Sequence, residues 1–254
     1  MLFRSVYAGA PGQSRILGAA KITGRAGHYS IGVMHALTQG TLADVSAAGV
    51  RSRAPVEPSS SFSVARVKRE FSNQSYIGGI ATATNRRLPT TLTGVLPDSS
   101  YVGGADFDWR VLRFYSLSGF VEGSRMHGDA TAIDAVQENS RHYFQRPDLT
   151  SARLDKTRTS LSGYSAELAF KKIGGEHVHF DSHVYARSPG FDSNDLGFLR
   201  RADQLHAQHW LQLRSNTLTR WFRQRNINFN QWSEWNYDGN LQFSGVNING
   251  NVTL

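Results

Sequence analysis

The chain has 254 residues, of which 39% are hydrophobic and 19% charged, and it contains no cysteine. Disulfide bonds and thiolate metal sites are therefore excluded, and no stretch approaches the roughly 18 consecutive apolar residues that a membrane-spanning helix needs. The formal net charge of +8 raises nucleic-acid binding as a function, but the basic residues are scattered over strand ends and loops, so we expect no nucleic-acid partner.

Alternation of apolar and polar residues predicts about eleven β-strands. In chain order they cover residues 15–23, 29–38, 62–71, 76–85, 101–112, 115–122, 160–172, 177–186, 205–214, 223–235 and 241–252. The clearest pattern is in 101–112, where Phe107 and Trp109 alternate with Asp106, Asp108 and Arg110. The apolar faces of these strands are candidates for contact with lipid.

The connections between the predicted strands alternate between short and long. The short ones are at 24–27, 72–74, 112–113, 173–176 and 215–219, and the long ones include 39–60, 86–99 and 125–159. Short turns at one rim and long loops at the other are typical of outer-membrane barrels, whereas a soluble β-sandwich gives no reason for such alternation. The pattern favours an all-β fold, an antiparallel up-and-down transmembrane β-barrel, formed by residues 1–254 as a single region. Core packing in a soluble β-protein is the alternative.

Both chain ends predict truncation. Met1 is not followed by a signal peptide, and Leu254 stops inside an alternating run. The odd strand number also differs from the even number of bacterial single-chain barrels. We therefore expect a fragment, which as an isolated piece could instead form an open, curled sheet with two unpaired edges.

The longest connection holds the one predicted helix, a short run that Asp129 can cap. Because long ordered loops in barrels often constrict the passage, residues 126–155 are a candidate gate, with a solvent-exposed excursion as the alternative. Aromatic residues near strand ends, such as Trp221, Trp232 and Trp235, are interpreted as membrane girdles.

The polar strand faces supply the candidate site residues. Those predicted to line a lumen, where charge pairs would tune the passage of charged solutes, are Asp106, Asp108, Arg110, Glu122, Glu167 and Lys171.

Metal binding is a less favoured interpretation of two other groups, and we expect no metal and no cofactor. His177, His179, Asp181 and His183 share one strand face, about 7 Å apart between alternate residues, so zinc would need a ligand from a neighbouring strand. Asp192, Asn194 and Asp195 are oxygen donors of the kind calcium uses, but such residues also cap turns.

Catalysis has no local sequence signature here, since no nucleophile elbow, phosphate loop or zinc-protease helix is present. A membrane-embedded hydrolase could still place serine and histidine on strands without such a motif.

Several segments, spread over nearly the whole chain, carry a resemblance to a known family. They are ILGAAKITGR at 16–25, YIGG at 76–79, HYFQRPD at 142–148, SPGF at 188–191, NDLGF at 194–198, RRAD at 200–203 and FNQW at 229–232. They resemble the bacterial domain-of-unknown-function family 5916, an outer-membrane β-barrel region that follows a family 9 carbohydrate-binding-like domain. The resemblance implies a location in the outer membrane of Gram-negative bacteria and supplies no catalytic residues. No such sugar-binding module is part of this sequence.

Three functions follow as hypotheses. The first is passage or capture of an extracellular solute, such as a glycan, by a polar lumen. The second is a membrane anchor for a periplasmic or surface carbohydrate-binding module, without transport. The third, an outer-membrane hydrolase, is the least favoured, so we expect no enzyme. The expected partners are outer-membrane lipid and an extracellular glycan or small solute.

Overall fold

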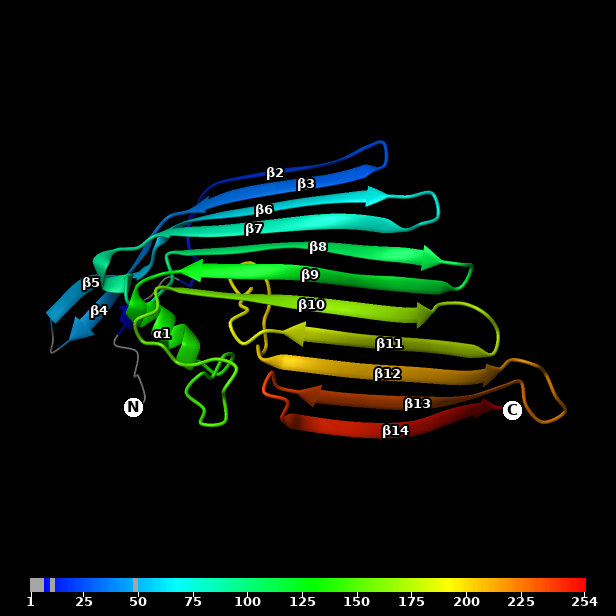
Figure 1. The fold of residues 1–254 in the computed structure, drawn as a ribbon. Coiled ribbons are helices and arrows are strands. Elements are labelled where there is room, and N and C mark those ends of the chain that lie inside the picture. The colour runs from blue at the N-terminus through cyan, green and yellow to red at the C-terminus, as the bar shows by residue number, and fades with distance from the viewer. Residues whose placement is uncertain (1–6, 10–11, 48–49) are drawn as a thin grey trace.

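The computed structural model describes residues 7–9, 12–47 and 50–254, and its main feature is one antiparallel sheet of eleven strands. Each strand pairs with its neighbour in sequence, apart from one inserted hairpin (Figure 1). The strands are β2 (Ile16–Ala26), β3 (Tyr29–Thr38), β6 (Ser59–Glu70), β7 (Tyr76–Arg87), β8 (Ser99–Val111), β9 (Tyr115–His127), β10 (Ser160–Lys172), β11 (Val178–Arg187), β12 (Gln204–Ser215), β13 (Gln224–Trp235) and β14 (Leu241–Thr253). The predicted all-β, up-and-down arrangement and its strand number are confirmed.

The sheet does not close into a barrel, and the open sheet expected as the alternative for a fragment is the arrangement observed. β2 and β14 are the two edges and do not pair with each other. The strand number explains why. In an antiparallel sheet of eleven strands the first and the last run in the same direction, so they cannot form the antiparallel pair that closes an up-and-down barrel.

A second, three-stranded sheet extends from the long-loop end of the main sheet (Figure 1). It consists of β1 (Tyr7–Gly9), β4 (Thr41–Ala47) and β5 (Val50–Glu57). Residues 39–60, expected to be a plain connection, instead contain β4 and β5. These strands escaped notice because they hold few large apolar residues and because Pro55, which cannot donate to a ladder, interrupts the pattern.

The connections lie at two opposite rims, as their lengths predict. The turns after β2, β6, β8 and β10 lie at one rim, and the connections after β3, β7, β9 and β11 lie at the other (Figure 1). The last two connections break the rule, because residues 216–223 make a longer loop on the short-turn rim and residues 236–240 a brief one on the long-loop rim. The β7–β8 connection contains the single-turn helix η1 (Thr90–Leu92).

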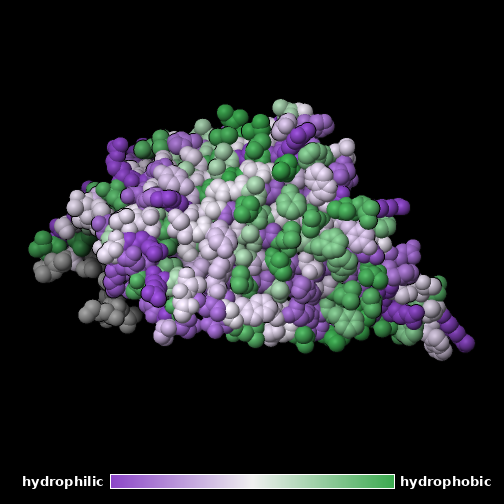
Figure 2. Space-filling view, viewed as in Figure 1, coloured by the Kyte–Doolittle hydropathy of each residue, from purple (hydrophilic) through white to green (hydrophobic). Residues whose placement is uncertain are grey.

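The two faces of the sheet differ in chemistry. One, here called the apolar face, carries Val67, Val121, Leu168, Val184 and Leu211, which are all exposed. In the part of the chain that the structure describes, no second layer covers these side chains, so the shared interior of a soluble sandwich is not what is observed. Apolar side chains gather over the half of the strands nearer the short turns (Figure 2). The opposite face is here called the polar face.

Helix α1 (Ala130–Glu138) begins where predicted, since the Asp129 carboxylate accepts a hydrogen bond from the Thr131 backbone N–H at 2.9 Å. It buries Ala132, Ile133 and Gln137. Among the described residues, no helix is long and apolar enough to cross a membrane.

Candidate functional site

The cross-strand register places every predicted lumen-lining residue on the polar face. Asp106 lies opposite Phe120, Phe120 opposite Glu167, and Glu167 opposite Tyr185. Directly opposite residues project to the same side of a sheet, so these strands present one continuous row. Asp108, Arg110, Glu122 and Lys171 follow by the period of two. That they line a lumen stays a prediction.

Charge pairs do form on the polar face, but mostly with partners other than those expected. Arg66 on β6 reaches across β7 and makes a bidentate pair with Asp106 on β8. Gly78 makes room for this crossing, because a Cβ there would lie 2.8 Å from the Arg66 guanidinium. Of the predicted residues, only Arg110 and Asp108 pair with each other, at 3.5 Å. Neither Glu122 nor Glu167 has an ion pair with a described residue.

The histidine-rich strand takes part in a similar network. Lys171 contacts Asp181 at 3.1 Å, and His183 lies 3.6 Å from the same carboxylate. His179 turns instead to the Gly175 carbonyl at 3.0 Å, while His177 lies in the turn before β11. Within the described ranges, no three His, Asp or Glu side chains are gathered as metal ligands. The zinc alternative therefore gains no support from the geometry.

An uncharged strip on the polar face of β12 to β14 is not among the predicted site residues. Gln212 donates to Asn228 at 2.9 Å, and Asn228 donates to Asn249 at 2.8 Å. The indole of Trp232 lies over Gly245, where a Cβ would come within 2.5 Å of the ring. Trp232 thus lies on the polar face. A girdle residue would lie on the apolar face, so the prediction that Trp232 is one is wrong. The alternate Asn at 226, 228, 230 and at 247, 249, 251 were the available signal.

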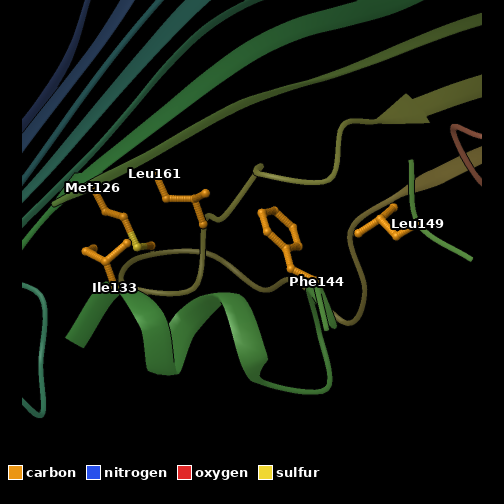
Figure 3. Packing of buried hydrophobic residues seen from close by; sticks show 5 residues of the cluster. All are labelled: Met126, Ile133, Phe144, Leu149 and Leu161. Atoms are coloured by element: carbon orange, nitrogen blue, oxygen red, sulfur yellow. The ribbon is translucent and has the colours of Figure 1, made fainter. Parts of the chain in front are cut away.

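The candidate gate, residues 126–155, folds back over the polar face. Met126 and Leu161, on the facing ends of β9 and β10, point toward Ile133 of α1 and toward Phe144 (Figure 3). These residues and Leu149 form a buried hydrophobic cluster. The alternative of a solvent-exposed excursion is therefore wrong, because burial of these apolar side chains holds the segment against the sheet. We call residues 128–159 and 188–203 together the loop cap.

A buried histidine joins the two halves of the loop cap. His142 is fully buried, and its Nδ1 lies 2.8 Å from the Pro189 carbonyl oxygen while its Nε2 lies 3.0 Å from the Asp192 carboxylate. The Asp192 backbone N–H in turn donates to Ser124 Oγ on β9 at 2.9 Å. Burial would raise the pKa of Asp192, but hydrogen bonds from His142 and Asn194 outweigh it and lower that pKa below its ordinary value.

The calcium candidates are all engaged with protein groups. Asp192 accepts from the Asn194 backbone N–H at 2.8 Å, which makes the two residues a turn. Asp195 forms an ion pair with Arg86. This use as turn cap and charge partner is the ordinary role of such residues in loops.

Two further contacts tie the loop cap to the β13–β14 connection. Arg146 pairs with the buried Asp203, which also accepts from the Tyr237 backbone N–H at 2.9 Å. Asp238 accepts from the backbone N–H of Thr150 at 3.0 Å. Partial burial would raise the pKa of the Asp238 carboxyl, but the hydrogen bonds from Thr150 and Ser151 outweigh this effect and lower that pKa. The cap is thus held by carboxylates at several points.

Serine and histidine meet twice, and both times on the apolar face. His35 lies 2.8 Å from Ser63, and His209 lies 2.7 Å from Ser182. A hydrolytic site also needs a group that orients the histidine. No described side chain makes such a hydrogen bond to either histidine. The hydrolase alternative therefore has a nucleophile and a base in contact, without the third element.

Comparison with known proteins identifies a family. The family described as Domain of unknown function (DUF5916) matches residues 4–95 and 119–254. No curated protein matches the chain.

Proposed function

The chain belongs to the DUF5916 family, and we propose that its sheet forms the wall of an outer-membrane β-barrel in a Gram-negative bacterium. The apolar face carries this proposal. Val121, Leu168 and Val184 lie in the middle strands with 56%, 49% and 47% of their surface exposed, although such side chains favour an apolar environment. Strands of 10 to 13 residues are long enough to cross the hydrocarbon core with a tilt.

The proposal requires partners for both edges of the sheet, because unpaired backbone groups are not tolerated in hydrocarbon. β2 and β14 run in the same direction. An odd number of additional antiparallel strands between them would restore the alternation and give the even total of bacterial barrels.

The polar face then takes part in the passage or capture of an extracellular solute. Charges on β6 to β11 are largely paired with each other, whereas the strip on β12 to β14 offers uncharged amides beside the flat ring of Trp232. Amides both donate and accept hydrogen bonds, as sugar hydroxyls do, and an indole ring offers an apolar surface to a sugar ring. A neutral glycan is therefore the solute class that this strip fits best.

A second candidate function is favoured by the loop cap. Its buried cluster fills the polar face at the long-loop rim, as expected of a packed barrel that anchors a carbohydrate-binding module and passes nothing.

The membrane part of the proposal can be tested with single cysteine variants, since the chain has no cysteine of its own. An environment-sensitive fluorophore would be attached at Leu168→Cys or, as the matched control from the polar face, at the adjacent Glu167→Cys. After folding into phospholipid vesicles, the label at 168 should report hydrocarbon and the label at 167 should not. Labels that both report water would refute the membrane placement.

The solute part can be tested by the swelling of vesicles that contain the folded protein. Swelling with neutral oligosaccharides, slowed or altered by Trp232→Ala, supports passage and eliminates the role of a mere anchor. Vesicles that swell no faster than protein-free ones would favour the anchor.

A further inference from the structure

The short-turn rim carries several basic side chains that form no ion pair among the described residues. Arg25 and Lys68 pair with Glu70, and Lys171 pairs with Asp181. The remaining outward or turn residues form no ion pair with any described carboxylate, and we call them the basic rim: Arg69, Arg113, Lys172, Arg220, Arg223 and Arg225. At the long-loop rim Arg86, Arg146 and Arg201 each pair with a carboxylate, whereas Arg87, Arg153 and Arg200 form no ion pair with a described carboxylate.

The basic rim borders the apolar face directly. Arg69 lies on that face between Tyr29 and Ile77, and Lys172 lies on it between Tyr115 and Phe180. Hydrophilic side chains project past the apolar ones at this end of the sheet (Figure 2). At the ends of several strands, a basic side chain therefore lies next to apolar side chains of the same face.

Aromatic rings accompany these cations. The Arg69 guanidinium lies 5.1 Å from the Phe71 ring centre, and Arg220 lies 5.3 Å from that of Trp221. Lys172 lies 5.9 Å from that of Tyr115. Aromatic rings concentrate where hydrocarbon meets head groups, and Arg and Lys keep their stems on apolar surface while the charge reaches outward.

We propose that the basic rim binds the phosphate groups of anionic phospholipids in the leaflet at the short-turn side, with acyl chains on the adjacent apolar face. The inference rests on the proposed membrane placement. Charge complementarity supports it, since cations next to an apolar surface match a lipid with a negative head group and apolar tails. A zwitterionic lipid offers the same tails without net charge, so it should bind less tightly.

The test uses quenching of tryptophan fluorescence by brominated lipids in the folded full chain. Trp109 and Trp221 lie near the basic rim and are exposed. Brominated phosphatidylglycerol should quench them at a several-fold lower lipid fraction than brominated phosphatidylcholine, about fivefold for each cation effectively engaged. High salt should reduce this preference in the unchanged chain, because it screens the attraction.

A matched pair of variants locates the effect. Arg69→Gln, Arg113→Gln, Lys172→Gln and Arg225→Gln together should abolish the preference. The same charge removed at the long-loop end, by Arg15→Gln, Arg87→Gln, Arg125→Gln and Arg153→Gln, should leave it in place. Equal quenching by both lipids in the unchanged chain would overturn the proposal and leave the membrane placement standing. If both variants lost the preference for phosphatidylglycerol equally, the preference would reflect general charge attraction, and the basic rim would not be a lipid-binding site. If neither lipid quenched the tryptophan fluorescence, both the proposed membrane placement and the proposed lipid binding by the basic rim would be refuted.

Discussion

The contact between Gly163 and the loop cap gives the sharpest test of how the cap is held. Gly163 lies on the polar face of β10, and a Cβ there would come within 2.5 Å of Phe191 Cα and still closer to Phe191 N. Both are backbone atoms, so no side-chain rotation relieves the clash. In Gly163→Ala the cap segment around Phe191 must move away from the sheet.

The cost can be worked from what that movement breaks. Overpacking alone costs about 1–3 kcal/mol. The hydrogen bonds of Asp192 to Ser124 and to His142 are lost with it, and a hydrogen bond to a charged group contributes about 1.5–3 kcal/mol. A total of about 3 kcal/mol or more corresponds to about a hundredfold rise in the population with an open cap.

Limited trypsin digestion in the folded state measures this population, since Arg153 and Arg200 lie in the loop cap. Gly163→Ala should be cleaved there about a hundredfold faster while the sheet keeps its circular dichroism. The control is Gly123→Ala on the neighbouring strand, where the nearest atom to a new Cβ is at an ordinary 3.8 Å. Equal cleavage of the two variants would refute the reasoning.

Three other predictions concern the cap, the apolar face and catalysis. The pKa of Asp192 in the folded protein lies below the ordinary value of about 3.9, so its contribution to cap stability is complete above about pH 4 and is lost as the pH falls through the folded pKa. Pepsin should therefore begin to cleave the cap only in that acid range, and Asp192→Asn should remove this pH dependence. Leu168→Arg should destabilise the vesicle-folded protein by about 2–4 kcal/mol in urea titrations, whereas a cost within about 0.5 kcal/mol, as for an ordinary exposed site, would contradict a lipid-facing position. Fatty-acid release from phospholipid vesicles should proceed at the spontaneous rate with the unchanged chain and with Ser182→Ala alike; faster release by the unchanged chain alone would establish the hydrolase.

Strands were predictable where one face is apolar and a tight turn fixes the register. β3 and β10 have the predicted bounds, 29–38 and 160–172. β8 begins two residues earlier than predicted, because Ser99 and Ser100 pair by backbone alone and leave no apolar signal. β4 and β5 are not predictable for a related reason, since their large apolar residues Leu42 and Val50 are exposed and the buried residue of β4 is the small Ala43, which marks no apolar period.

The site was predictable only in part, because its contacts join distant segments. The alternation placed Asp106 and Glu167 on one face, and the register confirmed it. Nothing in the sequence near His142 points to Asp192, its partner 50 residues later. The same holds for Arg66, which meets Asp106 only because Gly78 on the strand between them has no side chain.

Loop length explains how cations in the long connections can reach carboxylates in other connections, while a cation inside a tight turn cannot. At the long-loop rim the connections are long enough to fold back, so Arg146 in one connection meets Asp203 in the next. At the short-turn rim, connections such as the one around Arg113 consist of only a few residues between paired strands, and they have no slack to bring a carboxylate to that side chain. A cation in such a turn must be satisfied by water or by something outside the chain. Where the adjacent strands end in an apolar face, a lipid with an anionic head group meets both requirements at once.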